Sequence, residues 1–129
     1  MKTRILHPAS LRPPSPHISA GVLCDGFLFV SGQGPLDMSD RRIVPGTIEE
    51  ETLRTLENID AIVSAAGGSR KDVVKCTCYI ADLSLFPGFD RTYREFFSSD
   101  LPPARTTSQA GLLGGILVEI DAIARISAP

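Results

Sequence analysis

The stretch from residue 116 to residue 126 constrains the fold most strongly, because its side chains alternate between two chemically different faces. The first face is apolar throughout and consists of Ile116, Val118, Ile120, Ala122, Ala124 and Ile126. The second face consists of Leu117, Glu119, Asp121, Ile123 and Arg125. This alternation predicts a strand with one face in the core and one face that carries polar groups.

A shorter strand is expected to begin near Arg105, directly after Pro102 and Pro103. The glycine-rich residues 111–115 then lead into the 116–126 strand. Two strands joined by a short glycine-containing loop are typical of a β-hairpin. Such a hairpin would place Arg105 next to the polar face of the 116–126 strand.

Length and composition predict a single domain over residues 1–129, in which 43% of the residues are hydrophobic. The formal net charge of −2 provides no basic surface, which argues against nucleic acid as the main partner. No segment approaches the ~20 apolar residues of a membrane span, and the N-terminus lacks the apolar run of a signal peptide. Three cysteines, an odd number, suit a reducing cytoplasm better than a disulfide framework.

Prolines at positions 8, 13, 14 and 16 prevent a helix near the N-terminus, so residues 1–16 are expected to form a Pro-rich arm. Residues 13–16 fit a polyproline ligand, but a lead-in loop is the simpler interpretation. Further along, Asp25 and Gly26 separate the apolar runs 22–24 and 27–30, which predicts a hairpin.

Residue Thr47 is predicted to begin a helix, because Thr47 and Glu50 have the spacing of a capping box. Gly67 and Gly68 supply its C-terminal stop. The buried stripe expected from helical spacing consists of Leu53, Leu56, Ile59, Val63 and Ala66.

Residues 73–81 are predicted to form a strand with Val74, Cys76, Cys78 and Ile80 on one packed face. Two cysteines at this spacing, without a second pair, are a weak zinc signal. A second helix is expected after Ser84 as its cap. Its predicted inner stripe consists of Phe86, Phe89, Tyr93 and either Phe96 or Phe97.

The predicted order is therefore hairpin, helix, strand, helix, hairpin. Two amphipathic helices can cover only one face of the sheet on which they pack. The mixed second face of the 116–126 strand therefore indicates contact between sheets of different subunits in an oligomer.

The motifs, in this order and spacing, resemble the Rid family of reactive intermediate deaminases, also called the YjgF family. The resemblance extends from about residue 16 to residue 126 and rests on residues 29–33, 55–59, 65–67, 72–77, 93–97, 103–106 and 118–124. It implies an α+β, chorismate-mutase-like fold, a mixed β-sheet with two helices packed on one face. It also implies a homotrimer in which the three sheets close into a barrel, with sites between subunits.

The resemblance further implies a hydrolase acting on C–N bonds, a 2-iminobutanoate/2-iminopropanoate-type deaminase. Such an enzyme converts reactive enamines and imines to 2-keto acids and ammonia, without a cofactor or metal. The implied partners are the small-molecule imine, enamine or keto acid and further copies of the chain, with no nucleic acid and no membrane.

Six site residues follow from the resemblance. Arg105 matches the arginine that holds the substrate carboxylate, and Glu119 matches the acid that positions the attacking water. Gly32 and Thr107 match positions whose backbone contacts substrate or water. His17 and Asp90 complete the substrate-binding set.

Three of these residues depart from the family pattern. His17 replaces a common tyrosine, Asp90 a common asparagine, and Thr107 a common cysteine or valine. A carboxylate near an anion site weakens anion binding unless the carboxylate is paired or points away.

Two other function classes are considered beside the deaminase. A non-catalytic trimer that binds a keto acid or a related small carboxylate for regulation would retain Arg105, and the departures at His17 and Asp90 favour it. A ribonuclease or translation inhibitor, a label attached to some relatives, is disfavoured by the acidic charge balance. Ser31 and Ser108 lie in no Gly-x-Ser-x-Gly motif, which argues against a serine hydrolase.

Overall fold

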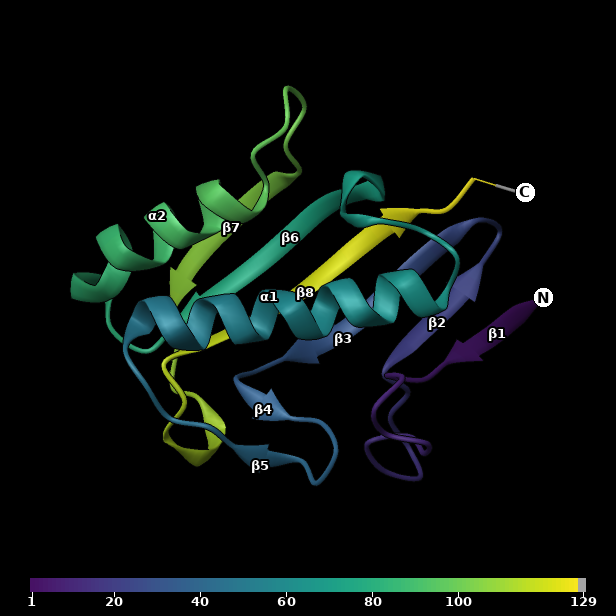
Figure 1. The fold of residues 1–129 in the computed structure, drawn as a ribbon, viewed down its shortest axis with the longest axis horizontal. Helices are drawn as coiled ribbons and strands as arrows, with labels where there is room; N and C mark the ends of the chain where they lie inside the picture. Colours follow the sequence, from purple (N-terminus) through teal and green to yellow (C-terminus); the bar gives the residue numbers. More distant parts are fainter. Residues whose placement is uncertain (128–129) are drawn as a thin grey trace.

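The computed structural model describes residues 1–127 and arranges them as strands and two α-helices (Figure 1). The strands are β1 Lys2–Ile5, β2 Gly21–Cys24, β3 Phe27–Gln33, β4 Leu36–Asp37, β5 Arg42–Ile43, β6 Val73–Ile80, β7 Ala104–Gln109 and β8 Val118–Arg125. The α-helices are α1 Ile48–Ala65 and α2 Phe86–Phe96. Six strands form one sheet in the order β1-β2-β3-β8-β6-β7, and β4 and β5 form a separate two-stranded sheet.

Both α-helices lie on the same face of the large sheet, and among residues 1–127 no helix covers its other face (Figure 1). The strands β6 and β7 pair in parallel, whereas the neighbouring pairs β3–β8 and β6–β8 are antiparallel. The predicted α+β architecture, a mixed sheet with two helices on one face, is therefore confirmed. None of the helices in residues 1–127 has the length and apolar character needed to cross a membrane.

The predicted hairpin of the last two strands is wrong, because β6 lies between β7 and β8. In β6, Cys76 faces Arg105 of β7 and Tyr79 faces Glu119 of β8. The glycine-rich linker crosses the end of β6 instead of closing a hairpin, and Gly114 and Gly115 have φ angles of 74° there.

The alternation predicted for residues 116–126 is confirmed, although β8 itself begins at Val118. The apolar face is buried over its whole length, from Ile116 to Ile126. The side chain of Glu51, only 3% exposed, accepts a hydrogen bond of 2.8 Å from the Leu117 backbone N–H. Its second oxygen accepts from the Gly46 N–H over 3.2 Å, so Glu51 ties α1 to both the preceding loop and the start of β8.

Helix α1 begins as predicted. The Glu50 N–H donates to Thr47 Oγ1 over 3.1 Å, and Glu50 Oε1 accepts from the Thr47 N–H over 2.9 Å, which completes the capping box. In the predicted stripe, Leu56, Ile59 and Val63 are buried, but Leu53 is 44% exposed. The inward face is rotated toward Thr52, Thr55 and Ile62, because the sheet contacts α1 along that side.

The hairpin of β2 and β3 is also confirmed, and Asp25 and Gly26 form its two-residue turn with φ angles of 53° and 79°. The strand β1 was not predicted. It pairs with β2 as the edge of the sheet, with Lys2 opposite Cys24. The Pro-rich arm therefore starts as a strand, and its residues 13–16 lie in an irregular connection.

Beyond β1, the arm is fixed by the buried side chain of His7. Its Nδ1 accepts a hydrogen bond from the Ala9 N–H over 3.1 Å, so its Nε2 carries the proton and donates to Asn58 Oδ1 over 3.1 Å. The Asn58 amide donates in turn to the backbone carbonyls of Gly34 and Leu36. Burial lowers the pKa of His7 from its ordinary value of 6.5.

On β6 the predicted packed face is confirmed at Cys76, Cys78 and Ile80, which are fully buried. Val74 is 46% exposed, so its predicted burial is wrong. The reason is an irregularity of the strand register between Val73 and Lys75, which shifts the alternation by one residue.

The start of α2 also differs from the prediction. Ser84 does not cap this helix, because residues 83–85 form a short 3-10 turn that precedes it. Asp82 caps that turn by accepting from the Ser84 N–H over 2.8 Å. Helix α2 itself starts at Phe86, with Pro87 in its first turn, where a missing N–H has no cost.

Candidate functional site

Arg105 lies on the edge strand β7 and points toward α2. Its partner in the parallel pairing, Cys76, is buried under the helices, so both side chains are on the helix-covered face. The guanidinium carbon lies 4.7 Å from the centre of the Tyr93 ring and 5.5 Å from that of Phe89. The side chain of Arg105 is 23% exposed, so α2 holds the guanidinium against aromatic rings at the rim of the core.

Asp90 of α2 neutralises part of the positive charge of Arg105. Its Oδ1 accepts from Arg105 Nη1 over 2.8 Å, and its Oδ2 lies 3.4 Å from Arg94 Nε. The carboxylate therefore lies between two guanidinium groups, and the three side chains together carry a net positive charge. The added carboxylate at position 90 is thus paired, which leaves the site attractive to an anion.

One edge of the Arg105 guanidinium remains available. Among residues 1–127, no hydrogen bond partner is found for its Nε or Nη2. These two nitrogens present parallel N–H donors, the arrangement that binds a carboxylate through both of its oxygens.

Thr107 follows two residues later on the same face of β7, opposite Cys78. Its Oγ1 is buried and makes no hydrogen bond to residues 1–127. We call Asp90, Arg105 and Thr107 the arginine cluster.

Gly32 and Glu119 form a second group, which we call the glutamate cluster. The pairing of β3 with β8 is irregular between Val30 and Gln33, and this bulge brings the Gly32 backbone over the Glu119 side chain. A Cβ atom at position 32 would lie 2.5 Å from Glu119 Oε2, so a side chain there would displace the carboxylate. The Glu119 carboxylate has no hydrogen bond or ion pair with any residue of the described chain.

His17 is exposed directly after the arm, and its Nδ1 lies 3.3 Å from Ser15 Oγ. The arm then joins β3, where Ser31 Oγ donates to the Ser19 carbonyl over 2.6 Å and the Ser31 N–H to that of Ala20 over 2.9 Å. The segment that carries His17 therefore ends beside Ser31, the neighbour of Gly32.

The two clusters lie on opposite faces of the sheet. Glu119 pairs with Tyr79 on the face without helices, whereas Arg105 pairs with Cys76 on the helix-covered face. The prediction that Arg105 reaches the polar face of β8 is therefore wrong. Its physical reason is the position of β6, which separates the two strands and fixes the direction of Arg105.

The two buried cysteines of β6 are core residues, as predicted. Burial raises the pKa of Cys76 to about 11 and raises that of Cys78 further, so both remain protonated thiols at neutral pH. Within residues 1–127, no group of three or more His, Cys, Asp or Glu side chains is placed to hold a metal ion.

Two residues beside Arg105 were missed by the sequence reasoning. Arg94 contacts Asp90, and the ring of Tyr93 lies under the guanidinium. The spacing of Asp90 and Arg94, four residues apart on a helix, is a signal that could have indicated their ion pair.

The family model described as endoribonuclease L-PSP matches residues 9–126. Among individual proteins, a RutC family protein of Pyrococcus horikoshii is 39% identical over 117 residues, which cover 91% of this chain and 90% of that protein. A 2-iminobutanoate/2-iminopropanoate deaminase of Capra hircus is 37% identical over 91% of this chain and 82% of its own length.

The same fold occurs in a solved structure from Yersinia pestis, a protein of unknown function described as belonging to the conserved Rid protein family. It is 31% identical, covers 98% of this chain and 100% of its own, and superimposes with a TM-score of 0.90. The matched length therefore spans the strands that carry both clusters.

Proposed function

The chain belongs to the endoribonuclease L-PSP family, which includes the Rid or YjgF proteins, and we propose that it is a deaminase of reactive imines and enamines. The substrate class is 2-iminobutanoate, 2-iminopropanoate and similar compounds, which water converts to a 2-keto acid and ammonia. A deaminase of this kind among the relatives supports the proposal. The observation that carries it is the free Nε–Nη2 edge of Arg105, which suits the carboxylate that all these substrates share.

The reaction needs few groups. Arg105 binds the carboxylate and so fixes the imine carbon in place. Glu119 accepts a hydrogen bond from a water molecule and directs its oxygen to that carbon. The C–O bond forms as the C=N π bond breaks, and one proton of the water passes to the nitrogen to give a carbinolamine. The hydroxyl proton then passes to the amino group, and the C–N bond breaks as the C=O bond forms, which releases ammonia and the keto acid. Positioning and electrostatic stabilisation then carry the rate.

Because the two clusters lie on opposite faces of one chain, we propose that each site forms between subunits. The arginine cluster of one subunit would meet the glutamate cluster and His17 of the next. A homotrimer whose sheets close into a barrel satisfies this requirement. The exposed Phe27 and Phe29 on the face without helices, 41% and 48% exposed, support burial of that face in an assembly.

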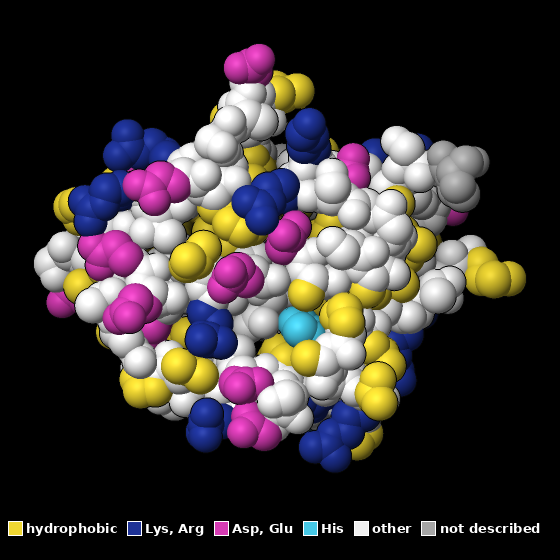
Figure 2. Space-filling view, in the orientation of Figure 1, with side chains coloured by type: hydrophobic (Ala, Val, Ile, Leu, Met, Phe, Trp, Pro, Cys, Tyr) yellow, Lys and Arg dark blue, Asp and Glu magenta, His cyan; other side chains and the backbone are white. Residues whose placement is uncertain are grey.

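A keto-acid-binding regulatory trimer remains a second candidate, because the free Nε–Nη2 edge of Arg105 suits the carboxylate of a keto acid as well as that of an imine. A nuclease is less well supported. On the helix-covered face, basic and acidic side chains alternate without a basic stripe (Figure 2).

The three free cysteines support a reducing compartment, and we propose the cytoplasm.

The proposal is tested by supplying imines made in situ from several amino acids and measuring ammonia and keto acid. Light scattering gives the oligomeric state. A stable monomer would contradict the shared site, and a trimer that binds keto acids without accelerating hydrolysis would support the regulatory candidate.

A mixing experiment tests the shared site directly. Trimers assembled from equal amounts of Arg105→Ala and Glu119→Gln chains contain some sites with both intact residues. If the residues come from different subunits, random mixing restores about a quarter of the wild-type activity. If both residues act within one chain, every site keeps a defect and mixing restores nothing.

A further inference from the structure

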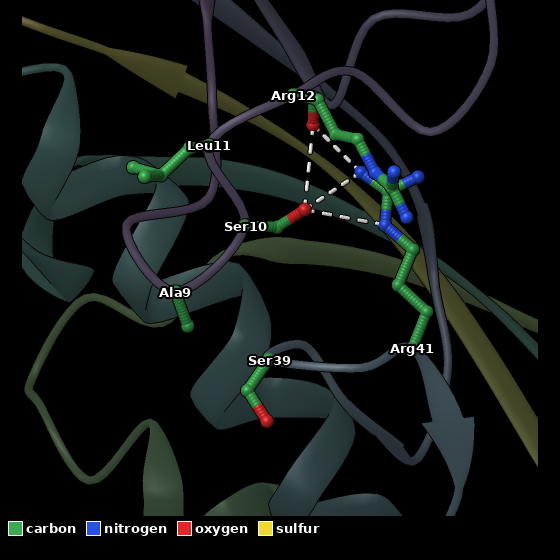
Figure 3. A pocket seen from close by; sticks show the side chains of 6 residues that line it. All are labelled: Ala9, Ser10, Leu11, Arg12, Ser39 and Arg41. Atoms are coloured by element: carbon green, nitrogen blue, oxygen red, sulfur yellow. Dashed lines mark hydrogen bonds between the residues drawn. The ribbon is translucent and has the colours of Figure 1, made fainter.

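A hollow of about 330 Å³ lies between the N-terminal arm and the loop that joins β4 to β5. It is separate from both clusters of the candidate site. Its lining consists of Ala9, Ser10, Leu11, Arg12, Ser39 and Arg41 (Figure 3).

Arg41 is held firmly at this hollow. Its Nε and Nη2 donate to Ser10 Oγ over 3.2 Å and 2.7 Å, and Nη2 also donates to the Arg12 carbonyl over 2.6 Å (Figure 3). Ser10 is itself buried, with 7% of its surface exposed. The guanidinium is therefore fixed by a buried side chain and a backbone group, and its Nη1 has no partner among residues 1–127.

Arg12 adds a second positive charge. Its side chain runs toward the guanidinium of Arg41 in Figure 3. None of the lining residues is acidic, and within the described chain neither arginine forms an ion pair. Two like charges that converge without a counter-charge repel each other, and an anion relieves that repulsion.

The nearest carboxylates in the sequence are directed elsewhere. Asp37 Oδ1 accepts from the N–H and the hydroxyl of Ser39, and Asp40 Oδ1 accepts from the Arg42 N–H. Both carboxylates therefore stabilise the loop itself. The two guanidinium groups keep unused donors at the mouth of the hollow.

We propose that this hollow binds the phosphate group of a small phosphorylated molecule. A phosphate dianion matches the two positive charges, and its oxygens can accept from both guanidinium groups. The volume of about 330 Å³ suits a small metabolite. Occupation of the site would add a further link between the arm and the β4–β5 loop, beside the hydrogen bonds that Arg41 already makes to the arm.

The test uses inorganic phosphate as the probe, in titrations of the full-length protein followed by calorimetry and by ³¹P NMR at constant ionic strength. Arg12→Gln removes one charge and leaves the arm in place, since the arm is held through the Arg12 carbonyl. Arg42→Gln is the matched control, because Arg42 is exposed, begins β5 directly after the β4–β5 loop and lies outside the lining. We expect Arg12→Gln to weaken phosphate binding about tenfold and Arg42→Gln to leave it nearly unchanged.

Arg105 offers a different anion site, so each titration is repeated in an Arg105→Ala background. Binding that survives there and depends on Arg12 supports the hollow independently of the proposed deaminase. Equal losses of phosphate affinity in Arg12→Gln and Arg42→Gln would mean that binding depends only on general surface charge, which would contradict the proposal. Binding that disappears with Arg105, or no saturable binding at all, would overturn the proposal.

Discussion

Asp90 and Arg105 form a 2.8 Å ion pair that links α2 to the edge strand β7. The pair leaves the Nε–Nη2 edge of the guanidinium free, but it places a negative charge close to any carboxylate bound there. The residue at position 90 therefore adjusts how strongly Arg105 attracts its ligand.

Asp90→Asn is expected to tighten the binding of a 2-keto acid about threefold to tenfold, because it removes this charge and preserves the hydrogen bond. Calorimetric titration at low and high salt measures the effect, which should shrink at high salt. Asp60→Asn is the control, since Asp60 forms a similar 3.0 Å pair with Arg70 away from the site. Weaker binding in Asp90→Asn would mean that the ion pair chiefly orients Arg105.

Arg105→Ala is expected to lower the rate constant at low substrate by roughly 30-fold to several thousand-fold, equivalent to about 2–5 kcal/mol for a lost two-point contact with a carboxylate. Arg105→Lys keeps the charge without the paired donors and should recover part of the loss. The free energy of unfolding should fall by only about 1 kcal/mol, as expected for a partly exposed ion pair. Denaturant titration checks this, and near-normal hydrolysis by Arg105→Ala would exclude the carboxylate clamp.

Glu119→Gln is expected to reduce turnover much more than keto-acid binding, because glutamine keeps the shape but loses the negative charge that orients and polarises the attacking water. Steady-state kinetics and calorimetry measure the two quantities separately. Glu57→Gln, an exposed change on α1, should alter neither. Equal losses of turnover and binding would assign Glu119 to binding or folding instead.

Gly32→Ala tests the contact across the bulge. The new methyl group would lie within 2.5 Å of Glu119 Oε2 and push the carboxylate aside. We expect turnover to fall at least about tenfold while the fold, followed by circular dichroism, is retained. Gly111→Ala is the control, since a Cβ there meets no atom within 4 Å. Unchanged turnover in Gly32→Ala would show that the position of Glu119 is unimportant.

The lowered pKa of the buried His7 side chain is expected to make the stability of the protein depend on pH. Because burial lowers its pKa in the folded state, the unfolded chain binds more protons near pH 6.5. The contribution of His7 to stability is therefore fully present above pH 6.5 and is lost as the pH falls toward the lower folded pKa. Urea unfolding between about pH 5 and pH 8 should show this loss in the wild type and in His17→Gln, but less of it in His7→Gln.

The sequence predicted those parts of the fold that depend on neighbouring residues. The capping box at Thr47 and the Asp25–Gly26 turn each set a local geometry, and both are present. The arrangement of β7 and β8 depends on β6, a strand about 30 residues earlier in the chain, and no local pattern reveals that insertion. The direction of Arg105 follows from the same pairing, so the separation of the two clusters was not predictable from alternation alone.

The candidate site shows the same difference between what the sequence reveals and what depends on tertiary packing. The sequence identified Arg105 and Glu119 as candidates because motifs around them resemble a family. It could not show that Asp90 contacts Arg105, because that contact requires α2 to pack across β7.

The place of β8 in the sheet has a consequence for how the protein is made. This last strand lies between β3 and β6, so it joins the N-terminal strands to the C-terminal pair of β6 and β7. During synthesis, nearly the whole described chain must leave the ribosome before β8 can pair with both β3 and β6. Until β8 is synthesised, the nascent polypeptide would expose the apolar faces of β3 and β6. Exposed apolar surface of this kind favours binding by chaperones.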